Sequence, residues 1–167
     1  MTRREREITD KKEIEEILGS CGYLHLGLVD DGKPYVVPMN YGVDHAEDGH
    51  VVVYLHSGLT GRKLDIIRKN ADCCFTMERG IQPFEGRMAC QYGVAYECLM
   101  GTGQIHIVDD VEEKKKALSV LMTTQTGKSF SFDDKMASIV AVMRIDVDEI
   151  TAKRRPLPAA LCYNTES

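Results

Sequence analysis

Apolar residues along the chain fall into short runs, of the kind that β-strands bury, separated by turn and loop residues. The runs predict six strands, over residues 23–29, 34–41, 50–56, 72–78, 94–108 and 138–147. Between the first two, Asp30-Asp-Gly-Lys33 contains the Asp-Gly pair that is typical of a tight hairpin. Pro38 interrupts the second run, and because proline cannot donate to a β-ladder, it predicts an edge strand, a bulge or an irregular stretch that faces a ligand.

Three stretches have the pattern of helices. The first, over residues 10–18, begins at Asp10-Lys-Lys-Glu13, which is similar to a capping box. The second is short and covers residues 61–69. The third begins after Asp109 or Asp110, and its apolar positions are Val111, Ala117, Leu118, Leu121 and Met122.

The remaining segments are expected to be irregular. Residues 42–49 form a polar loop, and residues 79–92 form a long connection of the kind that is often functional. The tail over residues 151–167 is also irregular. Consecutive hairpins with few helical crossovers therefore predict one domain over residues 1–167, mainly β with peripheral helices, built as an antiparallel sheet closed into a small barrel. A Rossmann fold is disfavoured, because no Gly-x-Gly-x-x-Gly follows the first strand.

The composition is that of a soluble globular protein, with 43% hydrophobic and 28% charged residues. The formal net charge of −5 argues against nucleic acid as the main partner. Apolar runs are too short for a membrane helix, and the charged N-terminal segment has no secretory pattern, so we expect a cytoplasmic protein without a membrane partner.

The six cysteines lack the Cys-x-x-Cys spacing of zinc or redox sites. We therefore expect reduced thiols that mostly fill the core, with the adjacent Cys73 and Cys74 on opposite faces of one strand. Cys90, beside the glycine-containing loop, is the best candidate for a nucleophile, but a role without chemistry is favoured. A cluster of Asp44, His45, Asp48 and His50 is the alternative for a metal, but no metal site is predicted.

The stretch after the third strand has the chemistry of an anion site. Ser57, Gly58, Thr60 and Gly61 supply hydroxyls and flexible backbone, and Arg62 and Lys63 then open the short helix. Cations normally favour the C-terminal end of a helix, so two of them in the first turn suggest an anion between them, and a phosphate is the natural candidate. Arginine can grip a phosphate bidentately, while lysine acts as a point charge.

Two neighbouring stretches are expected to line the same site. His56 ends the third strand as a structural histidine or as a hydrogen-bonding or catalytic group. On the predicted neighbouring strand, Pro38 would free main-chain groups for a planar heterocycle, and Asn40 would add an amide.

The sequences Pro34-Tyr-Val-Val-Pro-Met-Asn-Tyr41, Val53-Tyr-Leu-His-Ser57 and Gly61-Arg-Lys-Leu64, followed by Asn70, resemble the pyridoxamine 5′-phosphate oxidase-related FMN-binding split barrels. Tyr96-Glu-Cys-Leu-Met-Gly-Thr-Gly103 is similar to their nitroimidazole-resistance, or NimA-like, branch. The resemblance covers about residues 3 to 147. It implies a six-stranded split barrel and a homodimer with flavin sites at its interface.

The resemblance also implies site residues by position. Main-chain groups would back the isoalloxazine, the end of the third strand would contact the ring edge, ribityl chain or phosphate, and the paired cations would hold the phosphate. The main-chain groups behind the isoalloxazine belong to Val36, Val37, Pro38, Met39 and Asn40. The end of the third strand is Leu55, His56 and Ser57, and the paired cations are Arg62 and Lys63. Cys98 and Leu99 of a second subunit would close the site.

The resemblance implies an FMN-dependent oxidoreductase, with FAD as the alternative flavin and His56 as the candidate catalytic residue. A reduced nicotinamide or another donor would supply electrons to a small acceptor such as a nitroaromatic. The chain departs from true pyridoxamine phosphate oxidases, which carry an arginine and a lysine around the strand at residues 35–40 and a C-terminal substrate segment, so that activity is not expected. The alternatives are a non-catalytic flavin carrier or sensor and a haem binder on the same barrel.

Overall fold

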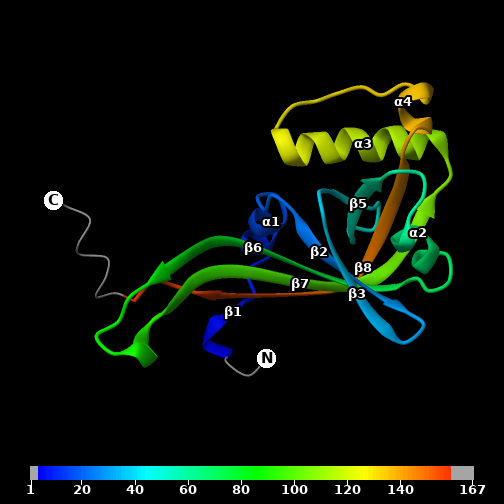
Figure 1. Ribbon diagram of the computed structural model, residues 1–167. Coiled ribbons are helices and arrows are strands. Elements are labelled where there is room, and N and C mark those ends of the chain that lie inside the picture. Colours follow the sequence, from blue (N-terminus) through cyan, green and yellow to red (C-terminus); the bar gives the residue numbers. More distant parts are fainter. Residues whose placement is uncertain (1–3, 159–167) are drawn as a thin grey trace.

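One antiparallel sheet of eight strands organises the computed structural model, which describes residues 4–158 (Figure 1). Hydrogen-bonded neighbours follow the order β3-β2-β6-β7-β8-β5-β4, and β1 pairs with β8 beside this path. The strands are β1 (Glu7–Ile8), β2 (Leu24–Asp30), β3 (Lys33–Met39), β4 (Tyr41–His45), β5 (Val51–Ser57), β6 (Asp72–Phe84), β7 (Gly93–Val108) and β8 (Ala141–Arg155). The helices are α1 (Lys11–Leu18), α2 (Arg62–Ile67), α3 (Val111–Thr126) and α4 (Asp134–Ser138), with 3-10 turns at Arg4–Arg6 and Ala89–Gln91.

The β2–β3 hairpin has the predicted form and position. Asp31 and Gly32 form its two-residue turn with φ angles of 50° and 80°, as a tight hairpin requires. β3 is an edge strand of the sheet, which is one of the three positions predicted from Pro38. The first helix is confirmed as well, with the Asp10 carboxylate accepting the N–H of Lys12 at its start.

The other end of the strand path corrects a prediction. All six predicted strands are present, but the sheet also contains β1 and β4, and β4 takes residue 41 from the predicted second strand and residues 42–45 from the predicted polar loop. Tyr41 explains the difference, because its side chain is fully buried and its hydroxyl donates to the carbonyl of Leu18 at 2.6 Å. Within residues 4–158, the end strands β3 and β4 do not pair with each other, so the fold is a split barrel.

α3 covers the outer edge of β4. Thr124 Oγ1 accepts the N–H of Val43 at 3.1 Å, and Gln125 Nε2 donates to the carbonyl of Tyr41 at 2.8 Å. Gly42 lies directly under the helix, since a Cβ built there would be 2.5 Å from both Cα and N of Leu121. The side chains of a helix thus satisfy backbone groups that another strand would otherwise take.

A three-stranded arm of β6, β7 and β8 extends away from the barrel (Figure 1). The predicted connection over residues 79–92 was wrong in its first part, because β6 continues to Phe84 after a register shift at Gly80, which has φ 63°. The predicted tail was wrong over residues 151–155, which belong to β8. The charged residues at the end of β8 did not indicate a strand, because a charged side chain can pack along apolar surface. The guanidinium of Arg155, for example, lies 4.7 Å from the centre of the Phe84 ring. Residues 159–167 of the predicted tail lie outside the described residues.

Two clusters of apolar side chains hold the fold together. Inward-facing residues of the strands form the barrel core, among them Leu24, Leu26, Leu55, Phe75, Met77 and Leu99. A smaller cluster between the sheet and α3 contains Val52, Tyr54, Val108, Ala117, Leu118 and Val142. The predicted inward positions of α3 are confirmed at Ala117, Leu118 and Leu121, whereas Val111 is exposed because it begins the first turn of the helix.

No helix within residues 4–158 is both long enough and apolar enough to cross a lipid bilayer.

Candidate functional site

The turn after β5 places the two predicted cations at the start of α2. Gly61 precedes the helix with φ 140°, a backbone conformation that residues other than glycine rarely adopt. Leu64, Ile66 and Ile67 are buried in the barrel core and fix the helix against it. Arg62 is consequently exposed and Lys63 is half-buried at the outer rim of the barrel.

Arg62 is held by two residues of the β2–β3 hairpin. Asp30 Oδ2 accepts from Arg62 Nε at 3.0 Å and lies 2.9 Å from Nη2. The Tyr35 ring lies under the guanidinium, with its centre 4.9 Å from Cζ, which is cation–π geometry. Neither Asp30 nor Tyr35 was predicted as a site residue, because the contact joins positions that are about thirty residues apart and the sequence carries no local signal for it.

Lys63 has a different environment from Arg62. Among residues 4–158, no carboxylate lies within 4.0 Å of its ammonium group. The site therefore contains one cation balanced by Asp30 and one without a charged partner in this part of the chain. That arrangement leaves a net positive charge beside the turn, which suits an anion.

The free edge of β3 supplies main-chain groups next to these charges. All residues of β3 are in register with β2. Because the turn has two residues, the flanking Asp30–Lys33 pair is the first hydrogen-bonded pair, and every second pair after it is hydrogen-bonded as well. Ladder alternation then turns the backbone groups of Pro34, Val36 and Pro38 toward the open edge. Since proline has no N–H, Val36 offers the donor there, and all three residues offer carbonyls.

Strand alternation divides the predicted site residues into two groups. Side chains that face the barrel interior can reach an outside ligand only through their main chain; these are Val37, Met39, Leu55 and Leu99. The side chains of Val36, Pro38 and Asn40 face outward and are exposed, whereas that of Cys98 is turned away from the barrel interior but is buried. Asn40 is already engaged, because its Nδ2 donates to the carbonyl of Gly22 at 3.0 Å.

His56 and Ser57 lie on opposite faces of β5. His56 is paired with Val142 and shares the face of Val52 and Tyr54, which α3 covers. Burial lowers the pKa of His56 below its ordinary value, and within residues 4–158 its buried Nδ1 has no hydrogen-bond partner. The imidazole is therefore neutral near pH 7, with one nitrogen that a ligand could satisfy. Its catalytic role stays a prediction.

The cysteines that the structure describes are all free thiols. Cys73 is buried and Cys74 exposed, as predicted for adjacent strand positions, and burial raises the pKa of Cys73 to about 12. Cys90 is exposed on a 3-10 turn. Cys98 lies 3.5 Å from Thr76 Oγ1 and faces a cavity of about 300 Å³. Cys162 lies outside the described residues.

The residues considered for a metal do not converge. Asp44 pairs with Lys116 at 2.7 Å, and His45 contacts Glu15 at 3.1 Å. Asp48 and His50 contact each other, but within residues 4–158 no group of three His, Cys, Asp or Glu side chains is arranged to hold a metal ion.

His50 instead belongs to a polar network on the outside of the sheet. Its Nδ1 lies 2.6 Å from Asp48, and its Nε2 lies 3.1 Å from Asp146 on β8. Arg144 donates to the same Asp146 oxygen at 2.6 Å and, through Nη1, to Glu113 of α3 at 3.0 Å. The network ties the first turn of α3 to β8 and to the residue that precedes β5.

We expect the pKa of His50 to lie above its ordinary value of 6.5, because Asp146 and then Asp48 hydrogen-bond the charged ring. Protonated His50 therefore stabilises the fold fully below the pKa of the unfolded chain, and this contribution disappears as the pH rises through the folded pKa. An NMR titration of the imidazole measures it. Asp146→Asn should lower this pKa, whereas Asp148→Asn, on the same strand, should not. A His50 that titrates at or below 6.5 would contradict the assignment.

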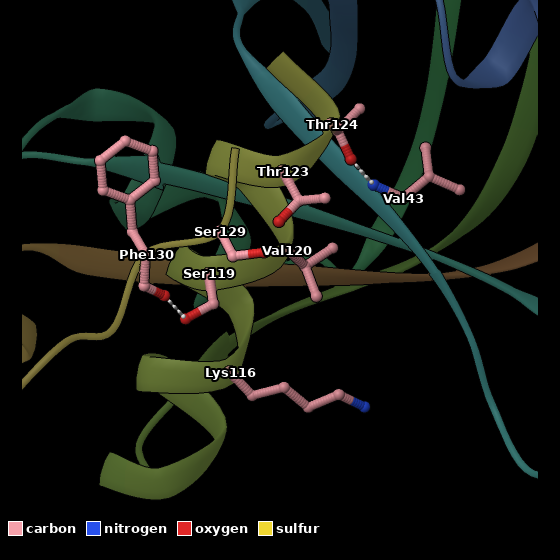
Figure 2. Close-up of a pocket in the computed structure, with 8 residues that line it drawn as sticks. All are labelled: Val43, Lys116, Ser119, Val120, Thr123, Thr124, Ser129 and Phe130. Atoms are coloured by element: carbon pink, nitrogen blue, oxygen red, sulfur yellow. Dashed lines mark hydrogen bonds between the residues drawn. The ribbon is translucent and has the colours of Figure 1, made fainter. Parts of the chain in front are cut away.

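A second cavity, of about 300 Å³, lies between α3, β4 and the segment after α3, and Figure 2 shows its lining residues. Its lining residues are Val43, Lys116, Ser119, Val120, Thr123, Thr124, Ser129 and Phe130. The Ser119 hydroxyl donates to the carbonyl of Phe130 at 2.9 Å, Thr124 holds Val43, and Lys116 is neutralised by Asp44. Most of its polar groups thus serve the protein itself, and it lacks the unbalanced cation present beside α2.

Comparison with known proteins adds family and fold information. The sequence pattern of the family described as pyridoxamine 5′-phosphate oxidase matches residues 10–154. A candidate 5-nitroimidazole antibiotic resistance protein from Bacteroides thetaiotaomicron VPI-5482 is 34% identical, with a TM-score of 0.75 over 89% of this chain and 86% of that one. No curated protein matches the chain.

Two more distant structures share the fold. The flavocytochrome Anf3 from Azotobacter vinelandii has 21% identity and a TM-score of 0.72, over 99% of this chain and 78% of that one. The FAD and heme binding protein from Mycobacterium smegmatis has 14% identity and a TM-score of 0.74, over 93% and 78%.

Proposed function

The chain belongs to the pyridoxamine 5′-phosphate oxidase family, and on this basis we propose that it is a flavin-binding oxidoreductase with FMN as its cofactor. The observation that carries the proposal is the pair of cations at the start of α2, of which Lys63 has no carboxylate partner in the described part of the chain. A phosphate monoester matches this positive charge, because charge-assisted hydrogen bonds are the strong ones. Arg62 and Lys63 would hold the phosphate, with Ser57 beside them.

The open edge of β3 would hold the heterocycle. The Val36 N–H and the neighbouring carbonyls present both a donor and acceptors in one line, which suits the alternating polar atoms of a flavin's pyrimidine edge. The exposed side chains of Val36 and Pro38 offer apolar contact to the ring face. A bound flavin supplies two-electron redox chemistry, and the residues of this chain bind it, orient it and limit its contact with water.

A homodimer would complete the site. The outward face of the sheet exposes the apolar side chains of Val29, Val36 and Met100, and such faces usually meet a partner. The same face carries Lys153 and Glu78 around the cavity that contains Cys98, so a two-fold arrangement can match opposite charges. Cys98 of the second copy would then lie near the ring. Sedimentation of the flavin-loaded protein should give twice the chain mass of 18.7 kDa.

The electron donor and acceptor are a further part of the proposal. We propose a reduced nicotinamide as donor and a small nitroaromatic as acceptor, and the name of the relative from Bacteroides thetaiotaomicron supports the acceptor. The second candidate is a non-catalytic flavin carrier. It is favoured by His56, because the side chain predicted to transfer protons lies on the face of β5 that α3 covers.

The purified protein tests the proposal directly. We expect a yellow protein whose extracted chromophore has the mass of FMN. NADH or NADPH should bleach its flavin absorbance, and a nitroaromatic should restore it. A chromophore with the mass of FAD would correct the cofactor and keep the redox function. A bound flavin that neither nucleotide reduces would favour the carrier, and a Soret band would replace flavin by haem.

A further inference from the structure

The contacts of Arg62 point to an additional residue that controls phosphate recognition. Asp30 Oδ2 accepts the Nε–H of the guanidinium at 3.0 Å and lies 2.9 Å from Nη2. Of the five N–H donors of an arginine, that of Nε is thereby bonded to Asp30, and the outer N–H groups of Nη1 and Nη2 lie side by side at the free end of the group. That free end is the one that can grip a phosphate with two parallel hydrogen bonds.

Burial shows which partner is fixed. The Asp30 side chain is 21% exposed and that of Arg62 is 60% exposed, so the carboxylate is the better shielded partner and the guanidinium projects outward from it. Asp30 is the last residue of β2, at the closed end of the hairpin, where its backbone pairs with Lys33. Tyr35, on the returning strand, supports the guanidinium from below, with its ring centre 4.9 Å from Cζ.

We infer that Asp30, with Tyr35, is a positioning residue that orients the free end of Arg62 toward the phosphate of the flavin. This inference rests on the proposed function. An exposed arginine otherwise samples many rotamers, and fixing it costs binding free energy each time a ligand is bound. Because Asp30 and Tyr35 already fix Arg62 in the folded protein, a ligand that binds does not have to order it. The carboxylate also repels the phosphate, but this repulsion acts at a distance and is screened by salt, whereas the short contact that orients Arg62 involves the better shielded Asp30 and is screened less.

The test compares two neighbouring carboxylates. Asp30→Asn and Asp31→Asn remove the same charge from the same hairpin, but Asp31 contacts Lys69, at 3.6 Å, instead of Arg62. The affinities of FMN and of riboflavin, which lacks the phosphate, are measured for both variants and for the wild-type protein in low salt and in roughly 0.5 M salt. The wild-type titration tests the proposed function by itself.

We expect Asp30→Asn to weaken FMN binding about three- to tenfold in high salt and to leave riboflavin binding unchanged. Asp31→Asn should match the wild type for both ligands. Tyr35→Leu should act like Asp30→Asn, and Tyr35→Phe, which keeps the ring, should restore affinity. Equal or tighter FMN binding by Asp30→Asn at both salt concentrations would overturn the inference, and so would an equal loss for FMN and riboflavin, which signals a merely structural role. Failure of the wild-type protein to bind FMN would remove the proposed function and the inference with it.

Discussion

Replacing Arg62 and Lys63 together by alanine should release FMN and leave the fold intact. Each charge-assisted contact contributes about 1.5–3 kcal/mol, so the double variant should lose about 3 kcal/mol or more, which is about two orders of magnitude in Kd. The fold should survive, because the buried anchors of α2 are Leu64, Ile66 and Ile67. Fluorescence titration with FMN and with riboflavin measures both the loss and its dependence on the phosphate.

The same helix region provides the matched control. Arg68→Ala with Lys69→Ala removes two positive charges at the far end of α2, where Arg68 pairs with Asp65 and Lys69 pairs with Asp31. This variant should bind FMN almost as well as the wild type, because it changes net charge without touching the turn. Unchanged FMN affinity in the Arg62 and Lys63 variant would refute the phosphate assignment. Equal losses in both variants would mean that these cations attract FMN only at long range and do not contact its phosphate.

Gly42→Ala should destabilise the fold by about 2–3 kcal/mol through a single added methyl group. The new carbon would meet the Cα and N of Leu121 at 2.5 Å and the carbonyl carbon of Val120 at 2.9 Å. These are main-chain atoms of α3, so no rotamer change can relieve the contact and the helix must move away from β4. Urea unfolding at fixed protein concentration measures the change in free energy.

Gly22→Ala is the comparison for this substitution. An added Cβ at Gly22 meets no atom within 4 Å, and its φ is not in the left-handed region. We expect its effect to stay within about 0.5 kcal/mol. The amide of Val43, which bonds to Thr124, should also exchange faster with solvent in Gly42→Ala. A stability of Gly42→Ala equal to that of Gly22→Ala would mean that α3 does not bear on the strand as described.

Local signals in the sequence predicted the elements that depend on neighbours along the chain. The Asp-Gly turn, the edge position of Pro38 and the start of α1 at Asp10 each follow from the chemistry of a few adjacent residues. The position of Arg62 and Lys63 at the start of a helix was predicted for the same reason, since the glycine turn and the helix start are contiguous. Their binding of a phosphate stays a prediction.

The missed features depend on contacts between distant segments. β4 is stable because α3, about eighty residues later, covers its edge, and no pattern in Tyr41 to His45 announces that helix. The partnership of Asp30 with Arg62 is equally non-local. The sequence does carry a signal for the side of β5 on which His56 lies. His56 continues the even-numbered series of Val52 and Tyr54, which places it on the α3 side of the strand.

The two prolines of β3 have a consequence for how this protein behaves at high concentration. An uncovered strand edge is normally a template on which another chain can add a strand and begin to aggregate. Along this edge Pro34 and Pro38 remove two of the three outward N–H groups and leave that of Val36, so a second strand would find too few donors to form a continuous ladder. The edge can therefore remain open for a small flat molecule without becoming a seed for fibrils.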